Sequence, residues 1–67
     1  MITININGTT HQLSESISIA TLIDDMSLTG KRIALERNGE IVPRSNYAIQ
    51  NLSDGDKLEV VVAVGGG

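Results

Sequence analysis

The sequence contains no cysteine, no tryptophan and no phenylalanine, and its one aromatic residue is Tyr47. The absence of cysteine excludes disulfides, thiolate zinc sites, iron–sulfur clusters and cysteine nucleophiles. It also means that this chain cannot carry sulfur as a cysteine persulfide. Because His11 is the single imidazole, we expect no protein-bound metal site and no cofactor held by this chain.

Basic residues are also scarce. Lys and Arg number 5 against 8 Asp and Glu among 67 residues, and the net charge is −3. Neither a basic patch nor an aromatic stacking platform is present for nucleic acid. No apolar run approaches the roughly 20 residues that cross a bilayer, and no signal peptide is visible. These absences predict a cytoplasmic domain that binds neither nucleic acid nor a membrane.

Two asparagine–glycine pairs, the favoured residues of two-residue hairpin turns, divide the sequence. The first, Asn7-Gly8, predicts a hairpin between strands at 2–6 and 9–14, because Ile residues alternate with polar ones before it. This register places His11 beside Ile4, so we expect a partly buried packing role for His11 rather than catalysis.

The second pair, Asn38-Gly39, predicts a hairpin between residues 33–37 and a short return strand at 40–42, which Pro43 ends. Residues 44–53 follow without a regular pattern. We expect their apolar side chains, which are Tyr47, Ile49 and Leu52, to anchor this segment over the edge of the core.

Between the hairpins the apolar spacing becomes helical. The stripe consists of Ile19, Leu22, Ile23 and Met26. It predicts an amphipathic helix over about 19–28. Ser18 is the expected N-cap and Gly30 the expected residue at C′, just beyond the helix.

The last strand, expected over 57–64, is the most apolar of the chain. We therefore place it in the middle of the sheet, parallel to the first strand. Its core side is formed by Leu58, Val60, Val62 and Val64. One short helix covers only one face of a sheet, so Val61 and Ala63 are expected on the open face, as a candidate docking surface.

This order of elements predicts the α+β class and the β-grasp arrangement of ubiquitin-like domains. The expected sheet is mixed, has about five strands, and carries one helix across one face. We assign residues 1–64 to this domain and residues 65–67 to a flexible glycine tail.

Two short motifs fit turns better than ligand sites. Asp54-Gly55-Asp56 lacks the further oxygen ligands of a calcium loop and is interpreted as a tight turn before the last strand. Thr29-Gly30-Lys31 lacks the remaining residues of a phosphate-binding loop. The chain therefore has no motif with which to bind a nucleotide itself.

The carboxyl end, Val64-Gly65-Gly66-Gly67, is the remaining candidate for chemistry. Glycine has no Cβ, so such a tail can thread a narrow channel in any backbone conformation. At 3.3–3.6 Å per residue it reaches roughly 10 Å beyond the sheet. Its one reactive group is the terminal carboxylate. The alternative interpretation is a frayed end without a role.

Three segments together resemble the ThiS family, the sulfur carrier proteins of thiamine biosynthesis. They are Asn38-Gly39-Glu40-Ile41-Val42-Pro43-Arg44-Ser45, Asp54-Gly55-Asp56 and Val64-Gly65-Gly66-Gly67. The resemblance covers the whole chain, but its first 30 residues match only in pattern. It implies that the chain is a carrier, a protein co-substrate of partner enzymes, and not an enzyme.

For the tail, the resemblance implies that Gly67 is the modified residue. An E1-like adenylyltransferase of the ThiF type uses ATP and Mg²⁺ to convert its carboxylate to an acyl adenylate. Sulfur that a cysteine desulfurase supplies then displaces AMP, and a thiazole synthase of the ThiG type takes sulfur from the resulting thiocarboxylate. Gly65 and Gly66 form the thread that enters both partner sites.

Three other functions remain open from the residues. The small subunit of molybdopterin synthase is also a β-grasp protein with a terminal Gly-Gly and uses the same tail chemistry. A ubiquitin-like modifier would be attached to lysines instead of giving up sulfur. A β-grasp interaction module would have no tail chemistry at all.

Overall fold

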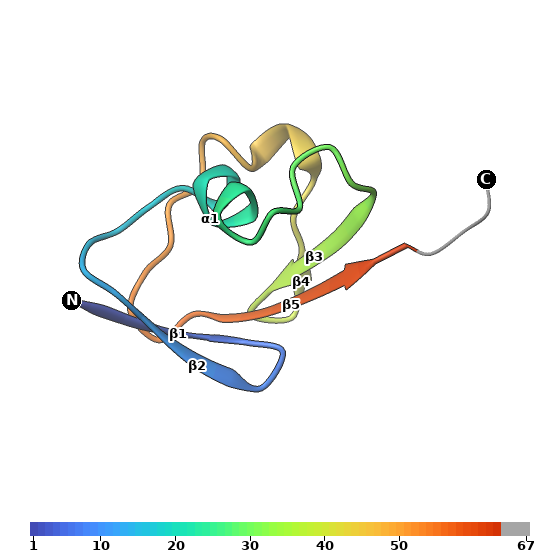
Figure 1. Cartoon of the computed structure of the whole chain (residues 1–67). Helices are drawn as coiled ribbons and strands as arrows, with labels where there is room; N and C mark the ends of the chain where they lie inside the picture. The colour runs from blue at the N-terminus through green and yellow to red at the C-terminus, as the bar shows by residue number, and fades with distance from the viewer. Residues whose placement is uncertain (64–67) are drawn as a thin grey trace.

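The computed structural model describes residues 1–63. Five strands form one mixed sheet, and a single helix lies across one of its faces (Figure 1). The elements are β1 (Ile2–Ile6), β2 (Thr9–Leu13), α1 (Ile19–Asp25), β3 (Ile33–Arg37), β4 (Glu40–Ile41), the 3₁₀ helix η1 (Arg44–Asn46) and β5 (Lys57–Val62). The strand order is β2-β1-β5-β3-β4, which confirms the central position of β5. It runs parallel to β1, as predicted, and antiparallel to β3.

The first hairpin has the predicted register, with Ile4 opposite His11 and Ile6 opposite Thr9. Asn7 and Gly8 both have positive φ, 51° and 87°, as a type I′ turn requires. The expected partial burial of His11 is wrong, because its side chain is exposed. Strand β2 is at the edge of the sheet, and this position leaves His11 outside the core although its partner Ile4 is buried.

The helix begins where the sequence predicted and ends earlier. Ser18 is the N-cap, and its Oγ accepts a hydrogen bond from the backbone N–H of Thr21 at 3.1 Å. Ser27, with φ of 60°, takes the left-handed position expected of Gly30. Its N–H donates to the Asp24 carbonyl, and the N–H of Leu28 donates to that of Ile23. These two bonds form a Schellman motif, so α1 stops at Asp25 rather than at residue 28.

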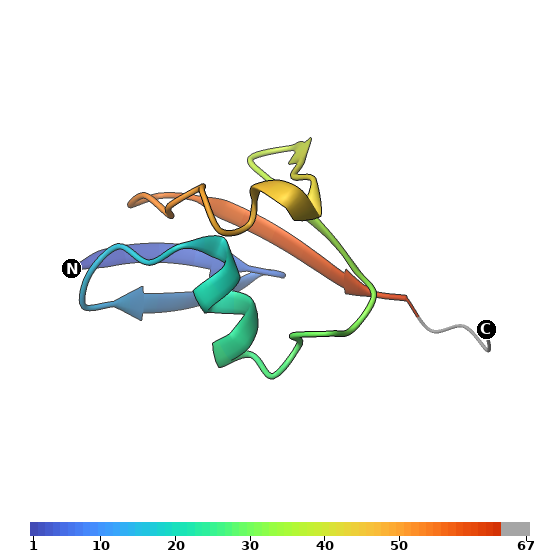
Figure 2. The same cartoon turned by 90° about the horizontal axis from the view of Figure 1, so that it is seen from above.

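The segment that follows β4 closes over the N-terminus of α1. The carbonyls of Tyr47 and Gln50 accept hydrogen bonds from the N–H groups of Ala20 and Ile19, at 2.8 and 3.0 Å. They thus satisfy two of the donors that the first turn of a helix leaves free. Figure 1 shows α1 and η1 on the same side of the sheet, and Figure 2 shows them side by side along it.

One hydrophobic core lies between the sheet and these two helices. Its buried side chains are Ile4, Ile6, Ile19, Leu22, Ile23, Leu35, Val42, Tyr47, Leu52, Leu58 and Val60. Tyr47 and Leu52 are thus anchors, as predicted, whereas Ile49 is 74% exposed. The N–H groups of Ile49 and Gln50 both donate to the Asn46 carbonyl, and this tight turn directs Ile49 into solvent.

A buried carboxylate, Asp56, ties the start of β5 to the second hairpin. It is 6% exposed and accepts hydrogen bonds from the Ser53 N–H at 2.8 Å and from Asn38 Nδ2 at 3.1 Å. Arg37 completes its partners, with Nη2 at 2.8 Å and Nε at 3.0 Å from Oδ2. Asn38 Oδ1 in turn accepts the Lys57 N–H at 2.9 Å.

These partners set the pKa of Asp56. Burial by itself raises the pKa of a carboxyl group, but hydrogen bonds from the Ser53 N–H, Asn38 and Arg37, together with the Arg37 charge, hold the pKa of Asp56 below its usual 3.8. The folded state therefore favours the ionised form of this carboxyl group more than the unfolded chain does.

We predict that Asp56→Asn lowers the free energy of unfolding at neutral pH by about 2 kcal/mol, because it removes charge-assisted hydrogen bonds from a buried site. Urea denaturation of both proteins measures this difference. Asp25→Asn, which changes an exposed carboxylate on α1, is the matched control and should be nearly neutral. Equal losses in the two variants would contradict a special role for Asp56.

The same comparison has a predicted pH dependence. The stabilisation by Asp56 is fully present above 3.8, its pKa in the unfolded chain. It is lost as the pH falls from that value through the lower pKa of the folded state. The stability difference between wild type and Asp56→Asn should therefore shrink below pH 3.8, and a difference that stays constant there would argue against the lowered pKa.

Candidate functional site

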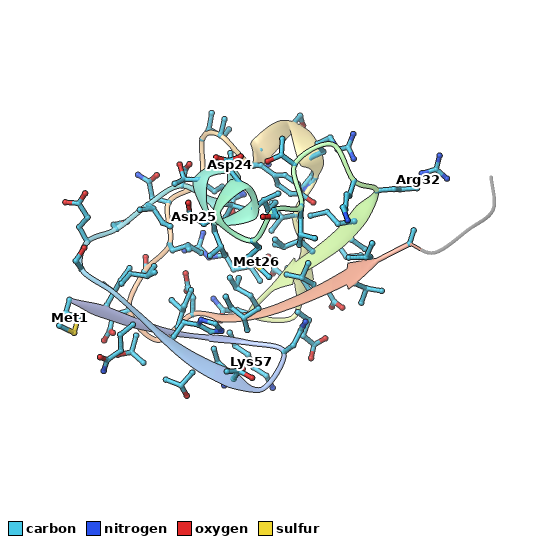
Figure 3. The ribbon with its side chains drawn as sticks, in the orientation of Figure 1. Met1, Asp24, Asp25, Met26, Arg32 and Lys57 are labelled. Carbon is cyan, nitrogen blue, oxygen red and sulfur yellow. The ribbon has the colours of Figure 1, made fainter. Side chains whose placement is uncertain are left out.

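The site begins where β5 leaves the sheet. The Ala63 N–H donates to the Arg32 carbonyl at 2.9 Å, so pairing with the β3 side holds the chain as far as Ala63. In Figure 3 Lys57 lies at the beginning of β5, whereas Arg32 lies beside its end. Gly65, Gly66, Gly67 and the expected domain boundary at residue 64 lie outside the described residues, so these assignments stay predictions.

On its other edge, β5 is held beyond the end of β1 by one side chain. The backbone pairing of β1 with β5 extends to Ile6 and Leu58. Beyond it, the amide of Asn7 takes the place of a strand: Oδ1 accepts the Val60 N–H at 2.8 Å and Nδ2 donates to the Val60 carbonyl at 3.0 Å. The turn residue Asn7 thereby supports the half of β5 that leads toward the tail, a role that sequence reasoning missed.

The open face of the sheet carries a small apolar patch near the end of β5. Val61 is 63% exposed, and Ala34, its partner on β3, is also exposed. Ile41, 70% exposed, pairs with Glu36 one step along the same face. We call Ala34, Ile41, Val61 and Ala63 the open-face patch. The exposure predicted for Val61 and Ala63 is confirmed, and their docking role stays a prediction.

Sequence reasoning found only half of this patch. The alternation in Ile33-Ala34-Leu35 already places Ala34 opposite to buried Leu35, and the Asn38-Gly39 turn sets Ile41 opposite Glu36. The places of Ala34 and Ile41 on the open face could therefore have been predicted from the sequence pattern. The expected burial of Val62 is wrong, because it is 41% exposed. Figure 1 shows the reason: β5 extends past α1, so the helix does not cover its last residues.

A hollow of about 280 Å³ lies on the opposite side of the sheet, between α1, the loop that follows it and η1. Apolar side chains line its floor, namely Ile23, Leu28, Ile33 and Tyr47, while Lys31 and Arg44 stand among its other lining residues. Arg44 Nη2 donates to the Lys31 carbonyl at 3.2 Å and thereby bridges the two sides. We call this feature the helix-side hollow, and sequence reasoning missed it.

The side chains of residues 1–63 form no recognisable catalytic arrangement. Within that range, no three His, Cys, Asp or Glu residues gather closely enough to hold a metal ion. In the same range, no helix has the length and apolar character needed to span a membrane.

A mixed five-stranded sheet with one helix across one face defines the class of ubiquitin-like β-grasp proteins. Within that class, a model of the ThiS family matches residues 3–67, which includes all three terminal glycines. The chain belongs to the ThiS family. The family and the fold that the sequence predicted are thus confirmed.

Solved structures agree with this assignment. The chain is similar to the crystal structure of the thiamine biosynthesis protein ThiS from Geobacter metallireducens, with a TM-score of 0.82 and 25% identity, over 98% of this chain and 100% of that one. It is similar to a solution structure of a thiamine biosynthesis protein from the same organism, with a TM-score of 0.79 and 26% identity, over 98% of this chain and 88% of that one.

Two kinds of relative resemble the sequence. A thiazole synthase from Paramagnetospirillum magneticum is 44% identical over 62 residues, which are 92% of this chain and 19% of that protein. An uncharacterized protein, ycf40, from Pyropia yezoensis is 38% identical over 98% of this chain and 93% of its own length. The chain thus spans about a fifth of the thiazole synthase relative and nearly all of the ycf40 protein.

Two neighbouring valines of β5 should respond differently to the same substitution. We predict that Val61→Asp lowers the free energy of unfolding by about 1 kcal/mol, because an exposed strand residue loses only its strand preference. Val60→Asp, the matched control, buries a carboxylate without a partner and should prevent folding. Circular dichroism with urea denaturation measures both, and a large loss for Val61→Asp would place that side chain in the core.

Proposed function

We propose that this chain carries sulfur for thiamine biosynthesis on the carboxyl group of Gly67. The observation that carries the proposal is the match to the ThiS family through Gly67, on a β-grasp fold whose central strand leads toward that residue. In this role the chain is a protein co-substrate, and its partner enzymes perform the catalysis.

The first step activates the carboxylate. A carboxylate oxygen of Gly67 attacks the α-phosphorus of ATP, the bond to the β-phosphate oxygen breaks, and pyrophosphate leaves. The product is an acyl adenylate with a good leaving group. Because this sequence has no phosphate-binding loop, ATP and Mg²⁺ belong to the partner, an E1-like adenylyltransferase of the ThiF type.

The second step exchanges oxygen for sulfur. A sulfide sulfur attacks the carbonyl carbon, the bond to the phosphate oxygen breaks, and AMP leaves a thiocarboxylate. When the donor is a persulfide of a cysteine desulfurase, two electrons from a thiol must then cleave the remaining S–S bond. The tail Gly65-Gly66-Gly67 has no Lys, Ser or Cys side chain that could capture the activated acyl group first.

The final acceptor in this proposal is a thiazole synthase of the ThiG type. Two proteins named thiazole synthase, from Paramagnetospirillum magneticum and Magnetococcus marinus, contain a region similar to this chain in 19% and 20% of their length. A carrier-like segment within a synthase chain is held permanently near its site of use. This arrangement supports thiazole synthase as the partner and favours the thiamine pathway over molybdopterin.

We further propose that the open-face patch docks these partners. Val61, Ala63 and Ala34 lie at the end of β5, whereas Ile41 lies further back, on the edge strand β4 and opposite Glu36. A partner that encloses the tail therefore meets this end of the patch first. Ile41 and Val61 are the large side chains of the patch, 70% and 63% exposed, and exposed apolar groups of this kind mark interaction sites when they are contiguous.

The mass of the intact protein tests the tail chemistry. After incubation with the adenylating partner, ATP, Mg²⁺ and sulfide, we predict a gain of about 16 Da on Gly67, the difference between sulfur and oxygen. A variant that lacks Gly67 is the control and should stay folded without gaining mass, because no core residue is changed. An unmodified wild type beside an active partner would refute sulfur carriage, and attachment to lysines would indicate a protein modifier.

The docking role of the open-face patch has its own test. Val61→Asp should slow thiocarboxylate formation by raising the KM for the carrier about tenfold, because a charged group enters an apolar contact. Glu59→Asp, on the same strand and face, is a control that leaves the patch unchanged. Equal KM values for wild type and Val61→Asp would show that docking uses another surface.

A further inference from the structure

The basic residues of this acidic chain are unevenly distributed. There are five. Arg37 pairs with Asp56, and Lys57 lines a small hollow together with Glu36 and Glu59. The other three, Lys31, Arg32 and Arg44, are exposed. One hydrogen bond joins Arg44 to the Lys31 carbonyl, and another joins Arg32, the next residue along the chain, to Ala63 at the end of β5. We call these three residues the tail-end cations.

Among the described residues, the tail-end cations form no salt bridge. In residues 1–63 the Arg37–Asp56 pair is the one salt bridge, and no Asp or Glu occurs between positions 26 and 35. Figure 3 shows the Arg32 side chain beside the end of β5, away from Asp24 and Asp25 on the helix. The end of the domain toward the tail is therefore positive, although the net charge of the chain is −3.

Two of these cations stand at the helix-side hollow. Lys31 and Arg44 line it together with the apolar side chains of its floor. One N–H of the Arg44 guanidinium donates to the Lys31 carbonyl. Its other N–H groups can donate to a ligand. Such a hollow fits a segment that offers an apolar side chain to the floor and carboxylates to the rim.

We infer that the helix-side hollow and Arg32 bind an acidic segment of the adenylating partner, with an apolar side chain of that segment in the hollow. The inference rests on the proposed function and adds a second docking surface, on the opposite side of the sheet from the open-face patch. The two surfaces lie on either side of the sheet near the end of β5, so a partner that binds both holds the domain where the described chain ends at Ala63.

The charge distribution favours an acidic protein surface as the ligand. Apart from the tail-end cations, the chain has eight acidic side chains and only two basic ones. A negative surface on the partner attracts the tail-end cations and repels the rest of the domain. This orients the carrier so that its carboxyl end approaches the partner first. The steering acts over about one Debye length, roughly 10 Å at moderate salt.

The nucleotide itself is a less suitable ligand for these cations. In the proposed reaction the phosphates of ATP meet the carboxylate of Gly67. The four residues beyond Ala63 span up to about 14 Å when extended. Cations near Ala63 therefore contact the partner's surface around the entrance to its nucleotide site, while Gly67 reaches the nucleotide inside that site.

Single charge removals in the full chain test the inference. Lys31→Gln and Lys57→Gln remove the same charge from opposite ends of β5 and are a matched pair. ATP–pyrophosphate exchange with the adenylating partner gives kcat and separate KM values for the carrier and for ATP. At low ionic strength we expect Lys31→Gln to raise the KM for the carrier about fivefold and Lys57→Gln less than twofold, because loss of a contact charge slows association.

Three further measurements make the test specific. Arg32→Gln should add to the effect of Lys31→Gln, and both effects should shrink at high salt. Ala48→Leu, which enlarges a lining residue of the hollow, should raise the KM for the carrier at any salt concentration. Urea denaturation of each variant shows that the fold is retained. The KM for ATP and kcat should remain unchanged.

Each contrary outcome has a distinct meaning. Equal effects of Lys31→Gln and Lys57→Gln would overturn the inference, because only net charge would matter. A change in the KM for ATP would assign the cations to the nucleotide and also overturn it. If wild type supports no exchange with an active partner, the proposed function fails, and this inference fails with it.

Discussion

The rest of the structure depends on the pairing of β5 along both of its edges. This strand is the last element of the fold and occupies the middle of the sheet, so the two hairpins become one sheet only when it inserts between them. It contributes Leu58, fully buried, and Val60 to the core. The strand that completes the domain is also the strand that leads to the glycine segment. The backbone pairing that stabilises the domain therefore also holds the strand that precedes the glycine segment.

Two polar side chains extend this arrangement at points where backbone pairing is unavailable. Asp56 fastens the beginning of β5 to the second hairpin through Arg37 and Asn38. Asn7 continues the support on the other edge after β1 has turned away. Both asparagines belong to the Asn-Gly turns, so each turn residue has a second role as a ligand of β5. A buried polar group is stable only when such partners are present, and here they also set where β5 begins and how far it is supported.

Local patterns predicted the elements of this fold well, and the errors concern tertiary position. The Asn-Gly turns, the alternation of Ile residues and the apolar character of the last strand are local signals, and each led to the observed element. The early end of α1 was missed because Ser27 adopts a left-handed conformation that glycine usually takes. His11 is exposed because β2 is an edge strand, Ile49 because of the turn at Asn46, and Val62 because β5 extends past the helix. The helix-side hollow brings together residues from 20 to 48, which no single stretch of sequence reveals.

A carrier that serves two enzymes in turn must bind each one and then leave it, and the described surfaces suit that requirement. The open-face patch is small, and exposed charge pairs contribute about 1 kcal/mol or less each. Small contacts of this kind are typical of transient complexes rather than permanent ones. In the proposed function, the covalent bond on Gly67 would record which reaction has occurred, while Lys31, Arg32 and the patch around Val61 would only orient the domain on its partner. In the proposed function, the carrier selects its partners through the surfaces near the end of β5. It can also dissociate after each reaction, because no single contact is strong.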